Sequence, residues 1–205
     1  MKRHNKDEKK KWPVILVASF IVFSMVISIF AVLVDNQSNS LPDYNKHSFV
    51  TSANGYKTKV NGEYMDFYYY PADIEKINLT PGMIDKLRHM SGLGIVFDPT
   101  QNSTDNLLYV DVIRYDLQMQ LDKPVYFGVT SNSTLYPSIP FVNCSFATPQ
   151  YPLILIDTNV SYTGSLDIFK VSPDNPDCII INAKLRDLLA SKDRIVYAYY
   201  GIMGD

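Results

Sequence analysis

The sequence predicts an α/β domain with a largely parallel sheet in layers, preceded by a small antiparallel β-meander and by an N-terminal transmembrane helix. Three observations support this fold class: a long uncharged apolar run, two Asn-Gly pairs between β-prone runs, and short apolar strands that alternate with amphipathic helical segments. About 170 residues follow the apolar run, which is enough to bury a core and to form one domain of common size.

The apolar run from Val14 to Val34 has 21 residues without a charge, the length of a helix that crosses a bilayer. Six basic residues precede it, and the next one is Lys46, so the positive-inside rule predicts a cytoplasmic N-terminus. We therefore expect a basic tail at 1–12, a signal anchor at 13–34 in the bilayer of the cell membrane, and a single pass with the C-terminal domain outside. A cleaved signal peptide is the alternative, although Phe30–Val34 offers no small-x-small cleavage site.

Residues 35–46 are polar and contain Pro42, which is typical of a stalk. The extracytoplasmic domain is expected at 47–205, and it begins with a three-stranded meander at 47–71. Its turns are predicted at Asn54-Gly55 and Asn61-Gly62, since Asn-Gly is a strong hairpin signal. The aromatic strand that ends the meander is expected to pack against the main domain, with an exposed binding surface as the alternative.

The next segments alternate between helix and strand. Thr80-Pro81 is typical of an N-cap and a first helical position, and the helix that follows is expected to end at Gly92. Leu93–Phe97 is continuously apolar, which indicates a strand buried on both faces. Residues 107–121 are predicted as a helix, although alternate apolar positions there also fit a strand.

Further strands are predicted at 125–129, 153–156 and 178–181, with a hairpin arm within 166–171. A closing helix is predicted from about Ala183 to Tyr200, with its apolar residues on one face. The charged residues of this helix are expected on its solvated face: Asp187, Lys192, Asp193 and Arg194. Tyr197, Tyr199 and Tyr200 are expected in the core, or alternatively on a docking surface.

Cysteines and glycosylation sequons both bear on the compartment. Cys144 and Cys178 form an even pair on the expected outer side, which favours a disulfide over two buried free thiols. Six Asn-x-Ser/Thr sequons follow the apolar run, and the first, at Asn36, lies too near the expected bilayer for modification. Glycosylation is predicted at the others, although the same residues also favour turns: Asn78, Asn102, Asn132, Asn143 and Asn159.

The net charge of the residues after the apolar run limits the classes of partner that we expect. The chain has 19 Lys and Arg and 21 Asp and Glu, of which six basic and two acidic residues precede the apolar run. The remainder carries 13 basic and 19 acidic residues, a formal net charge of −6. Nucleic acids and anionic surfaces need clustered Lys and Arg, so neither is expected as a partner.

The order of motifs resembles that of a family of surface proteins. The two Asn-Gly pairs, an aromatic strand and Pro71 precede Ile139–Cys144, the strand at 178–181 and the closing segments 193–197 and 201–203. In this order the outer domain resembles single-pass, membrane-anchored surface proteins of archaeal type. The strand at 178–181 with its final helix is also similar to the α/β repeats of some cell-envelope and S-layer proteins. The resemblance implies a location at the cell envelope, and it carries over no catalytic residue.

Few residues combine into a pattern that indicates chemistry. His4, His47 and His89 lack metal-ligand spacing with other ligands, and no phosphate-binding, dinucleotide-binding or nucleophile-elbow motif occurs. We therefore predict no metal and no cofactor. The acidic segment 174–177 could contact calcium, but its composition is more typical of a tight turn.

Asp98 and Asp157 each follow a predicted buried strand, so both could lie at the carboxyl edge of the sheet, where α/β proteins place ligands. They are the weak catalytic candidates of this chain, because paired carboxylates can hydrolyse glycosidic bonds. The favoured function is a non-catalytic domain that binds an envelope protein or glycan, or that has a structural role in the envelope. An extracytoplasmic hydrolase and an accessory subunit of a membrane complex are the alternatives.

Overall fold

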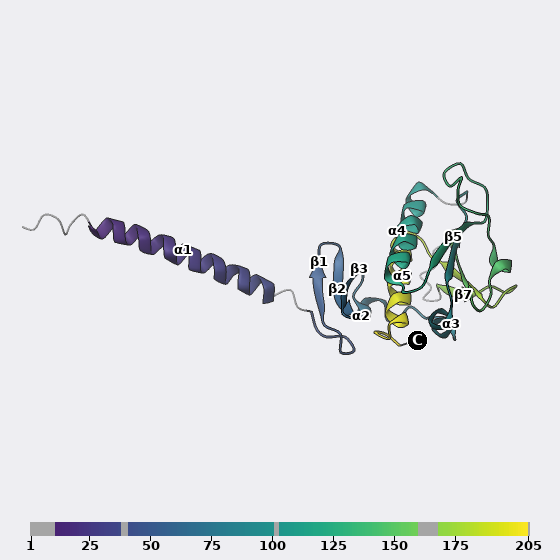
Figure 1. Ribbon diagram of the computed structural model, residues 1–205, viewed down its shortest axis with the longest axis horizontal. Helices are drawn as coiled ribbons and strands as arrows, with labels where there is room; N and C mark the ends of the chain where they lie inside the picture. The colour runs from purple at the N-terminus through teal and green to yellow at the C-terminus, as the bar shows by residue number, and fades with distance from the viewer. Residues whose placement is uncertain (1–10, 38–40, 101–102, 160–167, 205) are drawn as a thin grey trace, which may run out of the picture. The chain divides into compact units, whose positions relative to one another are not determined.

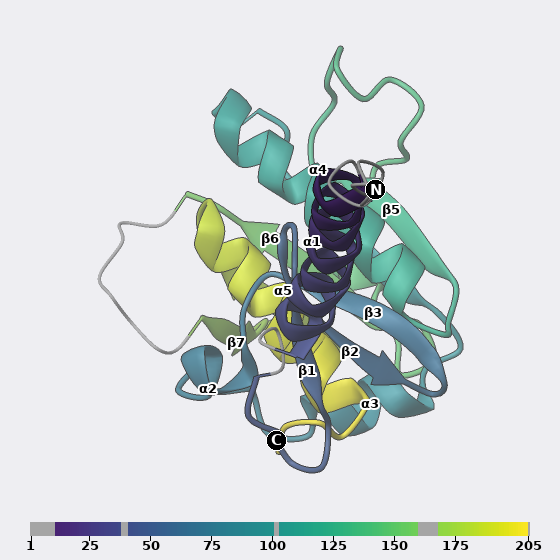
Figure 2. The ribbon, with the colours of Figure 1, turned by 90° about the vertical axis from the view of Figure 1, so that its left-hand side faces the viewer.

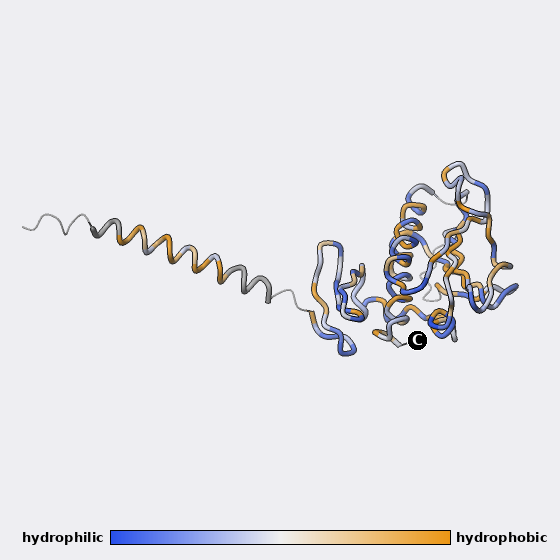
Figure 3. Tube along the Cα trace, in the orientation of Figure 1, coloured by the Kyte–Doolittle hydropathy of each residue, from blue (hydrophilic) through white to orange (hydrophobic). Residues whose placement is uncertain are grey.

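A computed structural model describes residues 11–37, 41–100, 103–159 and 168–204. The chain divides into two compact units, Met1–Leu41 and Pro42–Asp205. The first contains helix α1 (Lys11–Gln37), 27 residues long. Its described side chains, at 15–30, are exposed and mostly apolar around the whole circumference (Figure 3).

No helix within the described ranges is both long enough and apolar enough to cross a membrane. The transmembrane helix expected at 13–34 is therefore not confirmed, and it stays a prediction.

The predicted meander is confirmed in the second unit. Three antiparallel strands pair in the order β1-β2-β3: β1 (Phe49–Ser52), β2 (Gly55–Val60) and β3 (Glu63–Phe67). The turn between β2 and β3 lies at Asn61-Gly62 as predicted, with positive φ at both residues (51° and 94°), as a type I′ hairpin turn requires. The first turn lies at Ala53-Asn54 and not at the predicted Asn54-Gly55, because Gly55 already pairs with Ser52 in the β1–β2 register. The folded unit begins at Pro42, ahead of the predicted boundary at 47, because Asn45 Nδ2 donates to the carbonyl oxygens of Gly201 and Ile202.

The larger sheet confirms the prediction of an α/β fold with a mostly parallel sheet. Its order is β5-β4-β6-β8-β7, in which the first four strands are parallel and β7 is antiparallel to β8. Every residue of β4 is buried, as its continuous apolar run predicts. The strands are β4 (Leu93–Phe97), β5 (Val125–Val129), β6 (Leu153–Asp157), β7 (Phe169–Val171) and β8 (Cys178–Asn182).

Among its described residues, the second unit also has four α-helices: α2 (Pro71–Ile74), α3 (Met83–His89), α4 (Thr104–Gln120) and α5 (Arg186–Tyr199). The helix predicted at 107–121, whose pattern also fitted a strand, is confirmed by α4. The Ser103 hydroxyl caps α4 by accepting a hydrogen bond from Asn106 N. Helix α3 starts after Gly82, with φ of 74°, and not at Pro81. It also ends before Gly92, which is needed for packing because a Cβ there would lie 2.8 Å from the Tyr126 ring.

Helices α4 and α5 lie between the meander and the larger sheet (Figures 1 and 2). Tyr197 of α5 stacks on Phe67 of β3, with ring centroids 4.1 Å apart. Because α5 is covered from both sides, it is buried at every position from 190 to 199. The expectation that Lys192, Asp193 and Arg194 lie on a solvated face is therefore wrong, whereas Tyr197 and Tyr199 lie in the core as expected.

The opposite face of the larger sheet is covered by the later part of the segment 130–151, from Val142 onwards, which contains the short 3-10 helix η2 (Cys144–Phe146). Here Val96 and Leu153 pack with Ala147 and with the disulfide between Cys144 and Cys178, which confirms the predicted bridge. Asn175 Nδ2 donates to the carbonyl oxygens of Cys144 and Ala147, so the acidic turn at 174–177 holds this covering segment in place.

Candidate functional site

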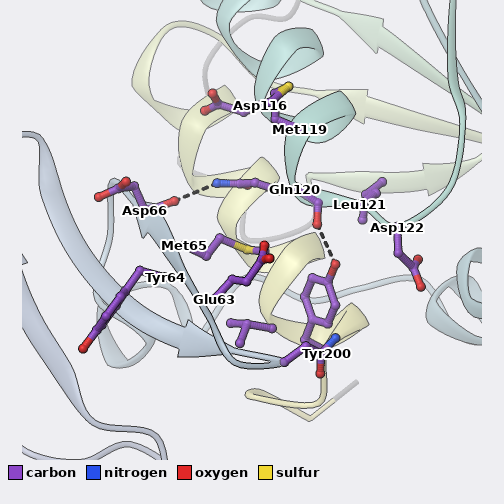
Figure 4. Close-up of a pocket in the computed structure, with 12 residues that line it drawn as sticks. Glu63, Tyr64, Met65, Asp66, Asp116, Met119, Gln120, Leu121, Asp122 and Tyr200 are labelled. Atoms are coloured by element: carbon purple, nitrogen blue, oxygen red, sulfur yellow. Dashed lines mark hydrogen bonds between the residues drawn. The ribbon is translucent and has the colours of Figure 1, made fainter.

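A groove with a volume of about 550 Å³ opens between β3 and the C-terminal end of α4 (Figure 4). It combines residues that lie far apart in the chain. Its lining comprises Val60, Asn61, Glu63, Tyr64, Met65, Asp66, Asp116, Met119, Gln120, Leu121, Asp122 and Tyr200. The site therefore exists only when the meander is packed on the helices.

Acidic and apolar groups share the groove. Four of its lining residues are carboxylates: Glu63, Asp66, Asp116 and Asp122. Tyr64 and Met119 are 68% and 66% exposed, which makes large apolar surface accessible beside these charges. Lys57 lies opposite Asp66 in the β2–β3 register, with Nζ 3.4 Å from Oδ1, and so offsets one of the four charges at the rim.

Gln120 joins the walls of the groove. Its Nε2 donates to the backbone oxygen of Asp66 at 2.7 Å, and its own backbone oxygen accepts from the Tyr200 hydroxyl at 2.6 Å (Figure 4). Its Oε1 accepts from Lys192 Nζ at 3.2 Å. A second cavity of about 130 Å³ shares Asp66, Asp116 and Gln120 with the groove.

Behind the groove lies a buried charge cluster, formed by Asp116, Lys192, Asp193 and Tyr68. Lys192 and Asp193 have no exposed side-chain surface, and Lys192 Nζ lies 2.5 Å from Asp193 Oδ1 and 3.5 Å from Asp116 Oδ2. Asp193 Oδ2 accepts from the backbone N–H groups of Tyr68 and Tyr69, at 2.7 and 2.8 Å. The carboxylate of Asp193 thus fixes the end of β3 onto α5.

The electrostatics of the cluster follow from its burial. Burial raises the pKa of Asp193, against the opposing effects of Lys192 and the two backbone N–H donors. The pKa of Tyr68 is raised to about 12 by burial, and further by the charge of Asp116 and a hydrogen bond to it. Its hydroxyl therefore keeps its proton and donates to the Asp116 carboxylate.

The weak catalytic candidates lie together at the carboxyl edge of the sheet, away from the groove lining. Phe97 pairs with Ile156 in the β4–β6 register, so Asp98 and Asp157 follow at neighbouring strand ends. Asp98 Oδ1 accepts from Thr100 N at 2.9 Å and from the Ser131 hydroxyl at 2.6 Å, and Asp157 Oδ1 accepts from Asn159 N. These are turn-stabilising contacts, and the catalytic role of the pair stays a prediction.

The predicted glycosylation sites differ in their surroundings. Asn78, Asn132 and Asn159 are exposed, whereas Asn143 is half-buried and its Oδ1 accepts from Ser145 N and Oγ. Asn102 lies outside the described residues. Modification at all five sites stays a prediction.

Within the described residues, no group of three His, Cys, Asp or Glu side chains could hold a metal ion. Sequence reasoning missed the groove because β3 and the end of α4 come together only in the tertiary structure. The one local signal was the aromatic and acidic composition of 63–67. Comparison with protein-family models, with curated proteins and with solved structures finds no match to the chain.

Proposed function

We propose that this chain is a membrane-anchored, extracytoplasmic domain that binds an envelope partner without catalysing a reaction. The observation that carries the proposal is the groove between β3 and α4, which combines four carboxylates with exposed tyrosine and methionine side chains. Pockets of 300–1,000 Å³ that join apolar surface to a few polar groups are typical binding sites.

The anchor and its orientation are supported by the 21 uncharged residues from Val14 to Val34 and by the basic residues ahead of them. Within α1 the Ser28 hydroxyl donates to the backbone oxygen of Ser24, so one of the few polar groups of this run has its partner inside the helix. The disulfide suits an oxidising compartment. The resemblance to archaeal-type surface proteins points to the same location.

The chemistry of the groove favours a positively charged ligand that also offers apolar contacts. Carboxylates attract Lys and Arg side chains, while Tyr and Met are enriched at protein interfaces. A peptide segment with alternating basic and aromatic residues, carried by an envelope protein, meets both requirements. Such binding should weaken as ionic strength rises, since exposed charges are screened.

The test uses the full chain in detergent micelles and two labelled synthetic hexapeptides, one alternating Lys and Tyr and the other Glu and Tyr. Fluorescence anisotropy should show saturable binding of the Lys peptide and none of the Glu peptide. Glu63→Gln should weaken binding of the Lys peptide about two- to fivefold, as expected for one exposed charge pair.

Asp174→Asn is the matched control, because it removes the same charge from an exposed turn outside the groove lining. Equal weakening by both variants would mean that only the overall negative charge attracts the peptide. That result, or equal binding of the two peptides, would contradict the proposed site.

A further inference from the structure

We propose that the buried charge cluster is a modification site, in which Lys192 and Asp116 join in an intramolecular amide bond between α5 and α4. Lys192 is fully buried, and its Nζ lies 3.5 Å from Asp116 Oδ2. That oxygen is bonded to the carboxyl carbon that Nζ would attack, so the ion pair places the amine beside its target. Asp116 also lines the groove, so the bond would leave the proposed ligand site with three charged carboxylates, Glu63, Asp66 and Asp122.

Two effects oppose each other at Lys192: burial disfavours its charge, whereas the faces of two aromatic rings stabilise the ammonium. Its Nζ lies 5.5 Å from the centroid of the Phe67 ring and 4.9 Å from that of Tyr68. Removing charges from water into such surroundings is costly, and an amide carries none.

Asp193 is placed to act as the proton carrier. Its Oδ1 lies 2.5 Å from Lys192 Nζ in an ion pair outside hydrogen-bond geometry, so a rotation of the ammonium is needed before Asp193 can take its proton and free the amine for attack. Its Oδ2 is held by the backbone N–H groups of Tyr68 and Tyr69, which fix the carboxylate in this position. The Tyr68 hydroxyl hydrogen-bonds to Asp116 and polarises the carboxyl group that is attacked.

The reaction balances without another reactant. The ammonium of Lys192 and the carboxylate of Asp116 first exchange a proton through Asp193, which gives a neutral amine and a neutral acid. A bond forms from Nζ to the Asp116 carboxyl carbon, and the bond from that carbon to one oxygen breaks. The second amine proton passes through Asp193 to the departing hydroxyl, which leaves as water, while Asp193 returns to its initial state.

The decisive measurement is the intact mass of the full chain. The protein is expressed in a host without N-glycosylation, and it is denatured and fully reduced before its mass is measured. We expect a mass below that of the sequence by one water. A tryptic digest should lose cleavage after Lys192 and yield residues 187–194 joined to the segment that contains Asp116, which distinguishes the bond from loss of ammonia at an Asn-Gly pair. The unmodified sequence mass, with normal cleavage after Lys192, would overturn the proposal.

Lys192→Arg tests the residue assignment, because it keeps the positive charge but removes the amine. The measured mass of this variant should equal the mass calculated from its sequence. The matched variant Lys184→Arg changes a lysine outside the cluster, and its measured mass should still lie one water below its calculated mass. A deficit that persists in Lys192→Arg would assign the lost water to another site and overturn the bond between Lys192 and Asp116.

Discussion

Single residues in this fold gain their roles from neighbours that are distant in sequence. Arg114 of α4 is largely buried, and its guanidinium carbon lies 4.8 Å from the ring centroid of Phe97 and 4.4 Å from that of Phe127. Its Nη1 donates to Asp111 Oδ1 at 2.6 Å, and the Tyr136 hydroxyl donates to Asp111 Oδ2 at 2.7 Å. Asp111 therefore connects a buried cation to the segment that covers the opposite face of the sheet.

The Tyr136 hydroxyl is expected to lose its proton only at an unusually high pH. Burial, followed by the hydrogen bond to Asp111 and the charge of that residue, raises the pKa of Tyr136 from about 10 to about 12. Because the folded pKa exceeds the unfolded one, the stabilising contribution is complete below pH 10 and is lost as pH rises through 12. Site-specific NMR titration of the Tyr136 ring should give a midpoint near pH 12.

Asp111→Asn should lower that midpoint towards 10, because the charge that opposes ionisation is removed. The matched variant Asp105→Asn removes an exposed carboxylate from the same helix and should leave the midpoint unchanged. An unchanged midpoint in Asp111→Asn would contradict the assigned cause.

At the scale of elements, α5 is the centre of the folded unit. The meander covers one side of this helix, and α4 and α3 contact it as well. Its C-terminal end receives a donor from α3, since Arg88 Nη2 donates to the Ala198 oxygen at 2.6 Å and Nε donates to the Tyr199 oxygen at 3.1 Å. These contacts add donors to the last carbonyl groups of the helix, of which the Ala198 oxygen also accepts from Gly201 N, and they place a cation at the negative end of the helix.

Arg88→Ala should therefore lower the free energy of unfolding by about 2 kcal/mol, the usual contribution of hydrogen bonds to a charged group. Chemical denaturation followed by far-UV circular dichroism would measure this change. Lys76→Ala, at an exposed position in the loop before α3, is the control and should change stability by less than about 0.5 kcal/mol. Equal effects of the two variants would contradict the capping role of Arg88.

For the whole molecule, the disulfide fixes the segment that covers one face of the larger sheet, where the described residues form no α-helix. The segment 130–151 contains only the short helix η2. Cys144, the first residue of η2, forms the disulfide bond with Cys178, the first residue of β8. The bridge spans a sequence separation of 34 residues. Closing a loop of this size restricts the unfolded chain and so stabilises the fold.

Reduction of the disulfide should lower the free energy of unfolding by roughly 3–4 kcal/mol. The measurement is denaturation of the full chain with and without reductant. The double variant Cys144→Ala/Cys178→Ala should have the lower stability in both conditions, because it has no bridge to reduce. Equal stability of the reduced and oxidised wild-type chain would contradict a stabilising role for the bridge.

The sequence by itself determined the elements of the fold, because hydrophobic periodicity and turn chemistry are local. The Asn61-Gly62 turn, the buried strand β4 and the helix at 107–121 were all predictable, and the even cysteine pair indicated the bridge. The same local reasoning placed Lys192 and Asp193 in solvent, where charged helix residues usually lie.

Only the tertiary structure decided the environment of those residues. The meander covers the side of α5 that an isolated helix would leave in water, so two charges become buried and must find partners within the fold. The groove has the same origin, since 63–66 and 116–122 meet only through this packing. Local sequence patterns specify which segments form, whereas burial and proximity depend on how distant segments pack.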